Sequence, residues 1–298
     1  MNRHTASLTF HPAVILLYFL IVVSFVMFLF HPVFLCISLL GSLSYFFLLK
    51  KKDFQLSSIK KLLPMFLFLS LLNPLFNHQG ATILFSITPT FVITLESFVY
   101  GLFVGILFFC IFIWFACCNV LLSSDKIIFL FSKFAPNLSL TFCVTLRLLA
   151  KYQTRLKEIR AAGIHSFGSD SFSSRLQKLK KTALSFFSVI SWALESSIIT
   201  SDSMKARGHG LKGRTSFSLF RFTVRDAVSL LLLCILFFFM LLAPIKQETV
   251  VSFYPFFSLS PPSGLTKLSY CSYTTLCFLP VILELWEDTK WHRLQSKI

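Results

Sequence analysis

The residues best suited to a chemical role lie in one short polar segment, residues 203–210, of an otherwise apolar chain. Arg207 stands directly before Gly208, and glycine readily adopts the left-handed conformation that ends many helices. A planar guanidinium at a helix end suits a bidentate contact with a partner's carboxylate, a geometry that Lys205 cannot reproduce. A desolvated anchor of this kind is worth about 2 kcal/mol or more. The alternative is a cation that merely stabilises the helix dipole, by about 0.3 to 1 kcal/mol.

The patterns that carry catalysis or hold a metal are missing from the sequence. It has no G-x-x-x-x-G-K-[ST] loop to hold nucleotide phosphates and no H-E-x-x-H pair to hold zinc. The seven histidines are scattered, and the eight cysteines form no C-x-x-C pair and lie mostly in apolar runs. We therefore expect a protein that is not an enzyme and that needs no metal or other cofactor.

The elements that must position the polar segment are those of a membrane protein. The chain is 55% hydrophobic and 13% charged, with a mean hydropathy of +0.77, so lipid must surround much of it. Six runs approach the roughly 20 apolar residues that a spanning helix needs. They cover residues 13–30, 33–49, 62–76, 95–122, 227–243 and 268–285. We expect an all-α integral membrane protein with about six transmembrane helices.

The basic residues indicate how these helices are oriented. The formal net charge is +16, from 28 lysines and arginines against 12 acidic residues. With a cytoplasmic amino terminus, only Lys246 and Lys267 fall on the outer side, which is the asymmetry of the positive-inside rule. Because orientation accounts for most of the charge, we expect no nucleic-acid partner. Both termini are expected in the cytoplasm.

A long polar stretch, residues 123–226, separates amino-terminal spans (1–122) from carboxyl-terminal spans (227–298). It predicts two amphipathic cytoplasmic helices: the first has a basic face, and the second covers about 175–207. The first helix has Leu149, Tyr152, Leu156 and Ile159 on its apolar face and Arg147, Lys151 and Arg155 on its basic face. A Gly- and Ser-rich linker over 163–174 separates the helices, and Gly208, Gly210 and Gly213 end the second. The alternative to a docking role is that both lie on anionic lipid.

The surroundings of Arg207 also match the pattern of a known family. Residues 203–210 read Ser-Met-Lys-Ala-Arg-Gly-His-Gly, with Asp202 before them and Gly213-Arg214-Thr215 after them. This resembles the signature that ends a cytoplasmic coupling helix in the transmembrane T component of energy-coupling factor (ECF) transporters. Residues 93–96 with Gly101, and residues 132–136, 145–148 and 158–163, resemble other parts of the same family. The resemblance runs from about residue 93 to residue 226.

The resemblance implies a non-catalytic subunit that works with partners. In that family the T component joins a small substrate-binding membrane subunit, the S component, to two cytoplasmic ABC ATPases. The residues that the resemblance assigns to ATPase binding are Ala206, Arg207, Gly208, Arg160, Ala161, Ala162 and Gly163. In the first motif Ala162 stands where the family has arginine. Arg160 lies two positions earlier, about 200° around a helix, so it is not an automatic substitute.

The location and cargo also follow from the resemblance. It implies a multi-pass protein of a bacterial cell membrane that imports a vitamin or other micronutrient chosen by the S component. Residues 212–226 favour a vitamin-type importer over a cobalt or nickel one. The alternative function is a self-sufficient secondary transporter, which predicts internal repeats and polar or broken helices at the bilayer midplane. The acidic residues nearest the spans, Glu96 and Glu284, are expected at the membrane interface.

Overall fold

The computed structural model describes most of the chain and divides it into two compact units. The described residues are 10–49, 52–77, 79–88, 91–132, 134–167, 175–211, 220–246, 248–249, 251–254, 258–259, 261 and 263–295. Unit 1 comprises Met1–Ser124 and Phe220–Ile298, and unit 2 comprises Asp125–Leu219. The predicted amino-terminal and carboxyl-terminal spans therefore belong to one unit, with the polar stretch inserted between them.

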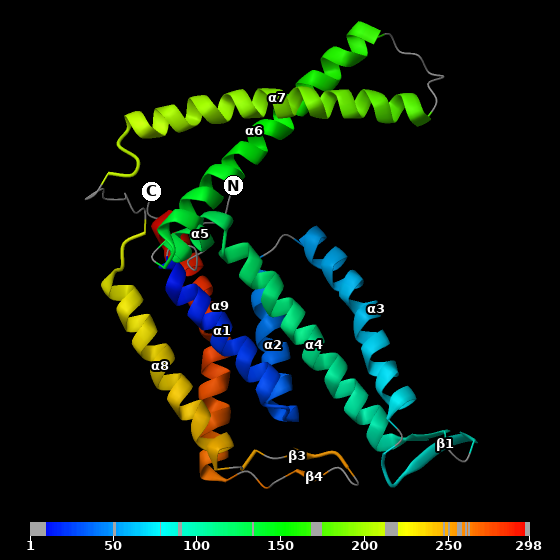
Figure 1. Ribbon diagram of the computed structural model, residues 1–298. Coiled ribbons are helices and arrows are strands. Elements are labelled where there is room, and N and C mark those ends of the chain that lie inside the picture. Colours follow the sequence, from blue (N-terminus) through cyan, green and yellow to red (C-terminus); the bar gives the residue numbers. More distant parts are fainter. Residues whose placement is uncertain are drawn as a thin grey trace. The chain divides into compact units, whose positions relative to one another are not determined.

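Unit 1 is a bundle of long helices (Figure 1). Helix α4 packs against α1, α2 and α3, while α9 packs against α2 and α8, and α1 also contacts α8. Five helices thus form a closed ring in the order α1, α4, α2, α9, α8, and α3 packs on the outside of α4. The bounds are α1 (Pro12–Phe28), α2 (Pro32–Leu49), α3 (Lys52–Phe76), α4 (Leu95–Leu121), α8 (Val224–Ile245) and α9 (Gly264–Gln295).

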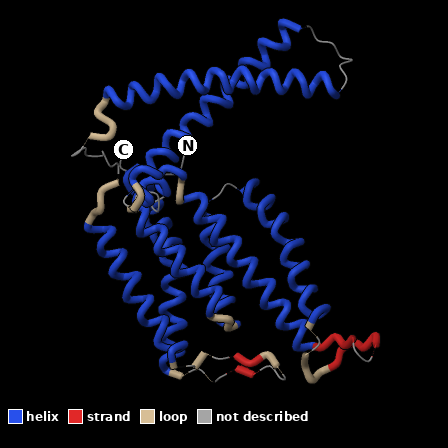
Figure 2. The backbone as a smooth tube through the Cα atoms, in the orientation of Figure 1, coloured by secondary structure: helices blue, strands red, loops and turns tan. Residues whose placement is uncertain are grey.

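Two short hairpins lie at one end of unit 1 (Figure 2). Strands β1 (Ile83–Thr88) and β2 (Phe91–Thr94) pair antiparallel before α4, and β3 (Val251–Ser252) pairs with β4 (Ser258–Leu259) before α9. Neither hairpin is among the elements predicted from the sequence. Ile, Val, Phe and Thr dominate β1 and β2, and such residues favour a strand where the run is too short to span.

Several helices have the length and composition of membrane spans. Within the described part of the chain, five qualify: α2, α4, α8, α9 and residues Thr182–Ala206 of a helix in unit 2. Helix α1 is apolar but has only 17 residues. Helix α3 does not qualify, because its apolar part begins after Lys61 and is shorter than the roughly 20 residues of a full span. These findings confirm a largely helical chain with several helices able to cross a membrane, whereas the count of six stays a prediction.

Close helix contacts in unit 1 depend on glycine. A Cβ on Gly101 of α4 would lie 2.5 Å from the carbonyl oxygen of Ser70, and one on Gly105 would lie 3.0 Å from the Phe66 ring, both on α3. Gly41 of α2 meets Cys277 of α9 in the same way, with 2.8 Å to its Cβ. Small residues at helix interfaces let backbones approach in lipid, where the hydrophobic effect adds little to helix association.

Buried polar contacts complete the core of unit 1. The indole of Trp114, which is fully buried, donates to Ser38 Oγ at 2.9 Å and so joins α4 to α2. At the start of α8, the buried carboxylate of Asp226 accepts from His11 N at 2.8 Å and from Thr223 N at 2.9 Å. Asp226 therefore caps α8 and ties it to the start of α1.

The two acidic residues expected at the membrane interface are both buried. Glu96 lies in the first turn of α4 and accepts from the hydroxyl of Thr82 at 2.8 Å and from its backbone N–H, beside the β1–β2 hairpin. Its position at a helix start agrees with a capping role. Glu284 lies within the long helix α9 and is 7% exposed. Neither belongs to a group of three potential metal ligands among the described residues.

Candidate partner-docking site on α6 and α7

Unit 2 consists of a short helix and two long ones. Helix α5 (Ser124–Ser132) leads to α6 (Pro136–Phe167), and α7 (Arg175–Ala206) crosses α6 (Figure 1). The Ser139 hydroxyl donates to the Ile128 carbonyl at 3.0 Å and holds α6 against α5. Both long helices were predicted from the sequence. The structure therefore confirms that both predicted segments are helical.

The crossing of α6 and α7 is built around one tryptophan. The Trp192 ring of α7 meets the Tyr152 ring of α6 edge-on, with 5.8 Å between their centroids. Lys151 Nζ lies 4.8 Å from the centre of the same indole, and the Arg155 guanidinium lies 5.6 Å from it. Such contacts are worth about 0.5 to 1.5 kcal/mol for the aromatic pair and about 0.5 to 1 kcal/mol for each exposed cation. The basic face predicted for α6 is thus partly turned toward α7.

The second motif forms the carboxyl end of α7, as the sequence predicted. Gly208 has a φ of +79°, its N–H bonds to the Lys205 carbonyl at 2.9 Å, and His209 N–H bonds to the Met204 carbonyl at 3.0 Å. These two bonds define a Schellman motif, in which glycine occupies the left-handed position. Ala206 is the last residue of α7, and Arg207 follows as the capping residue. The helix therefore stops directly after the arginine.

The Arg207 side chain is exposed and projects from this helix end. It forms no hydrogen bond, ion pair or ring contact with any residue that the structure describes, in contrast to Lys151, Arg155 and Arg160 of α6. A guanidinium with five free donors next to a fixed helix end can receive a carboxylate without first breaking an internal contact.

The first motif is arranged differently. Arg160, Ala161, Ala162 and Gly163 lie inside α6, which continues to Phe167, so the predicted linker begins too early. Gly163 costs the helix only about 1 kcal/mol relative to alanine, and α6 continues through it. The Arg160 guanidinium lies 5.9 Å from the centre of the Phe186 ring of α7. Ala162 is exposed, and its position is turned away from that of Arg160. The first motif consequently offers no free arginine.

The structure does not bring the two motifs together. They lie near the carboxyl ends of α6 and α7, and these ends belong to opposite arms of the crossing (Figure 1). At 1.5 Å per residue, the first motif lies roughly 12 to 17 Å and the second roughly 21 to 24 Å from the Tyr152–Trp192 contact. Any partner that engages both motifs must therefore be large, or two partners must bind separately.

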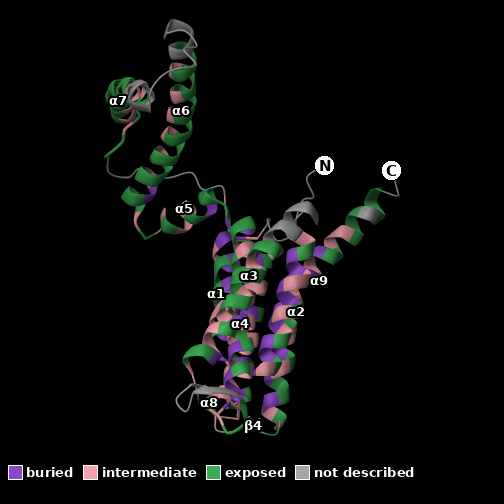
Figure 3. Cartoon of the chain, turned by 90° about the vertical axis from the view of Figure 1, so that its right-hand side faces the viewer, coloured by how far each residue is buried: buried purple, intermediate pink, exposed green. Residues whose placement is uncertain are grey.

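An apolar stripe on α7 was not predicted from the sequence, from which only the basic residues of this stretch were emphasised. Five large apolar side chains recur every three or four positions and are all more than half exposed (Figure 3 shows α7 largely exposed). This α7 stripe consists of Leu184, Phe187, Ile190, Leu194 and Ile198. It lies within Thr182–Ala206, the part of α7 that is apolar enough to cross a membrane. The stripe needs a cover of lipid or protein.

Comparison with known proteins adds no assignment to this geometry. The chain matches no protein-family model, and no curated protein matches it at a significant level. Of the predicted site residues, Ala206, Arg207 and Gly208 are consecutive, with the first two exposed and Gly208 partly exposed, whereas Arg160 is engaged with α7.

Proposed function

We propose that this chain is the transmembrane scaffold and energy-coupling subunit of an ECF-type ABC importer for a vitamin or other micronutrient. It would link two ABC ATPases to a small membrane S component and perform no catalysis itself. The observation that carries the proposal is the free Arg207 guanidinium on a helix end stopped by Gly208. That geometry matches the docking role that the surrounding sequence suggests.

The crossing of α6 and α7 supports a mechanical form of coupling. The docked ends would lie on opposite arms, so closure of the ATPases around ATP would change the angle between the two helices. Because the side chains that join the arms cluster at Trp192, the crossing would act as the pivot. The connected membrane helices would then carry this motion to the S component.

The α7 stripe supports a second contact surface. Five exposed apolar side chains on one face suit the apolar surface of a small membrane subunit better than the hydrated surface of an ATPase. In this arrangement α7 would hold an ATPase at its Arg207 end and the S component along its length. The transported compound would be selected by the S component.

Charge reversal at Arg207 tests the proposal. Arg207→Glu should abolish copurification with the ATPases, because it replaces a bidentate donor with an acid that repels the partner's carboxylate. Lys205→Glu makes the same charge change two residues away, and it should retain most of the complex. Arg207→Lys should fall between them. Equal ATPase yields from Arg207→Glu and Lys205→Glu would contradict a specific docking role for Arg207.

A further inference from the structure

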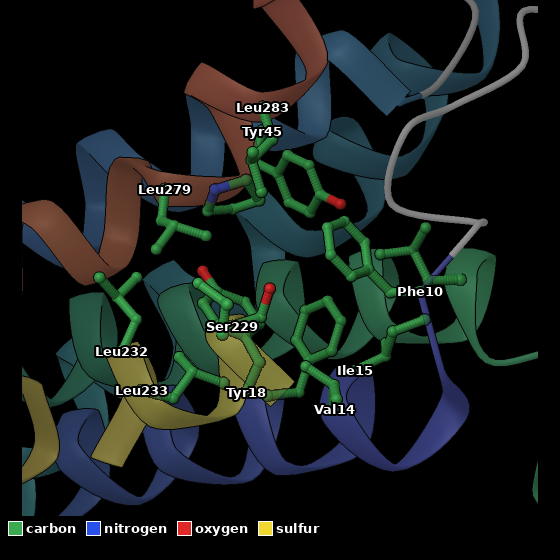
Figure 4. A pocket seen from close by; sticks show the side chains of 14 residues that line it. Phe10, Val14, Ile15, Tyr18, Tyr45, Ser229, Leu232, Leu233, Leu279 and Leu283 are labelled. Carbon is green, nitrogen blue, oxygen red and sulfur yellow. The ribbon is translucent and has the colours of Figure 1, made fainter. Parts of the chain in front are cut away.

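Unit 1 contains an apolar cavity that the proposed coupling function does not use. It has a volume of about 180 Å³ and is lined by side chains from α1, α2, α4, α8 and α9 (Figure 4). Val14, Ile15, Leu233 and Leu279 are among the lining side chains, and Tyr18, Tyr45 and Ser229 contribute hydroxyls. An apolar cavity of about 150 Å³ in another protein stays dry and binds benzene or xenon, so this one is large enough for part of an alkyl chain.

Two of the three hydroxyls in the wall already donate to backbone carbonyls. The Tyr18 hydroxyl donates to the Leu276 carbonyl at 3.3 Å, and the Ser229 hydroxyl donates to the Arg225 carbonyl at 2.9 Å. Neither hydroxyl has a proton left to donate to a polar solute, which would also lose its hydration on entry. The wall therefore selects an apolar occupant.

The mouth of the cavity lies at α8. Val228 is 62% exposed and Leu232 is 42% exposed, whereas Val14, Ile15 and Leu233 are buried. Val228 to Leu233 lie roughly 5 to 15 Å along α8 from its first residue. If α8 spans the membrane, this is the depth of the upper carbons of a lipid chain, and the cavity opens sideways toward that chain.

An unpaired arginine stands above the mouth. Arg225 precedes Val228 and Ser229 by three and four residues, so its side chain lies on the cavity face of α8 one turn closer to the helix start. Arg225 is exposed and forms no ion pair with any described residue. The neighbouring acid, Asp226, forms no ion pair with it, since that carboxylate is buried and accepts from His11 and Thr223.

We propose that unit 1 binds one anionic phospholipid, with an acyl chain in this cavity and the phosphate group at Arg225. An acyl chain inside the cavity would make dispersion contacts with the lining side chains. These contacts are absent when the chain stays in the bilayer and the cavity is empty. The headgroup would add charge attraction, which is strongest for the anionic lipids of the cytoplasmic leaflet. The inference depends on unit 1 lying in a membrane and is independent of ATPase docking.

Photo-crosslinking in lipid nanodiscs tests the acyl-chain part. The full chain is reconstituted with phosphatidylglycerol that carries a diazirine on one acyl chain, irradiated and mapped by mass spectrometry. Labelling should concentrate on the cavity-lining peptides of α1 and α8. Leu232→Trp, which blocks the mouth of the cavity, should reduce the labelling of these peptides to the level seen without irradiation. Leu231→Trp is the matched control, because Leu231 is 61% exposed and does not line the cavity.

The headgroup part is tested with the same diazirine on phosphatidylcholine. Phosphatidylglycerol should label the wild-type cavity about fivefold more strongly, and Arg225→Gln should remove this preference while Arg225→Lys keeps it. Equal labelling of Leu232→Trp and Leu231→Trp would overturn the acyl-chain site. Equal labelling by both lipids, or stronger labelling by a free diazirine fatty acid, would overturn the anionic phospholipid as occupant. A cross-link to another protein from a photoreactive residue at position 232 in native membranes would also overturn this occupant.

Discussion

The two units of this chain stabilise their helices in opposite ways. In unit 1, five helices form a closed ring, and the fully buried Trp114, Tyr45 and Tyr273 lie among them. In unit 2, α6 and α7 meet at a single crossing centred on Trp192, and the α7 stripe stays exposed. Unit 1 thus has large aromatic side chains fully buried between its helices, whereas unit 2 leaves an apolar stripe exposed. We propose on this basis that unit 1 is the fixed frame and that unit 2 is the part that meets partners.

The largest effect should come from removing the cap that joins α1 to α8. Asp226→Ala leaves the His11 and Thr223 N–H groups without their carboxylate, and it should destabilise unit 1 by about 2 to 4 kcal/mol. Thermal unfolding of the purified protein measures this loss. Asp202→Ala removes an exposed acid from α7, and it should leave the unfolding temperature of the bundle unchanged. Equal losses in both variants would contradict the frame role of unit 1.

A similar but smaller loss is expected at the contact between α3 and α4. Gly101→Ala places a methyl group 2.5 Å from the Ser70 carbonyl, and backbone cannot yield as a side chain can. We expect a loss of about 1 to 3 kcal/mol from overpacking. Gly264→Ala, where nothing lies within 4 Å of the added Cβ, is the matched control in the same thermal assay. An unchanged Gly101→Ala protein would show that α3 does not depend on this close approach.

In unit 2, truncation of the central ring should free the two arms. Trp192→Ala removes the contacts with Tyr152, Lys151 and Arg155, which together contribute about 1.5 to 3.5 kcal/mol. Spin labels on the two arms of α6 and α7 should report a broader distance distribution, while the unfolding temperature of unit 1 stays the same. Trp291→Ala, which removes an exposed ring of α9, is the control. A distribution as narrow as in the wild type would mean that other contacts hold the crossing.

The smallest effect should appear at the end of α7. Gly208→Ala forces a side chain into a φ of +79°, which costs about 1 to 2 kcal/mol and should fray the last turn. Hydrogen exchange of residues 203–209 should become faster. Gly208→Asn should restore most of the protection, because asparagine tolerates this conformation. Equal exchange rates in Gly208→Ala and the wild type would contradict a stabilising Schellman motif at the end of α7.

Much of the helical framework could be predicted because it depends on local patterns. Apolar runs predicted residues 33–49 and 227–243 as helix, and the structure has α2 at Pro32–Leu49 and α8 at Val224–Ile245. The stop at Gly208 was predicted correctly, since a left-handed glycine is a local requirement. The linker predicted from Gly163 was wrong by several residues, because α6 continues to Phe167.

The features that the sequence did not reveal depend on contacts between distant segments. Nothing near Arg160 predicts that its guanidinium faces Phe186, because that contact arises only when α6 and α7 cross. Gly105, four residues after Gly101, forms a G-x-x-x-G pair, but the pattern alone does not identify α3 as its partner. The tie between Asp226 and His11 joins residues that are 215 positions apart. Tertiary contacts of this kind leave no local signal.

The most direct test of the proposed function is purification of the tagged wild-type chain from its native membrane, followed by mass spectrometry of the intact complex. The proposal predicts two ABC ATPase chains and one small membrane subunit bound to this chain, with substrate uptake only by the full assembly. Recovery of the chain without an ATPase, together with uptake by the chain alone after reconstitution, would contradict the proposal and favour a self-sufficient transporter.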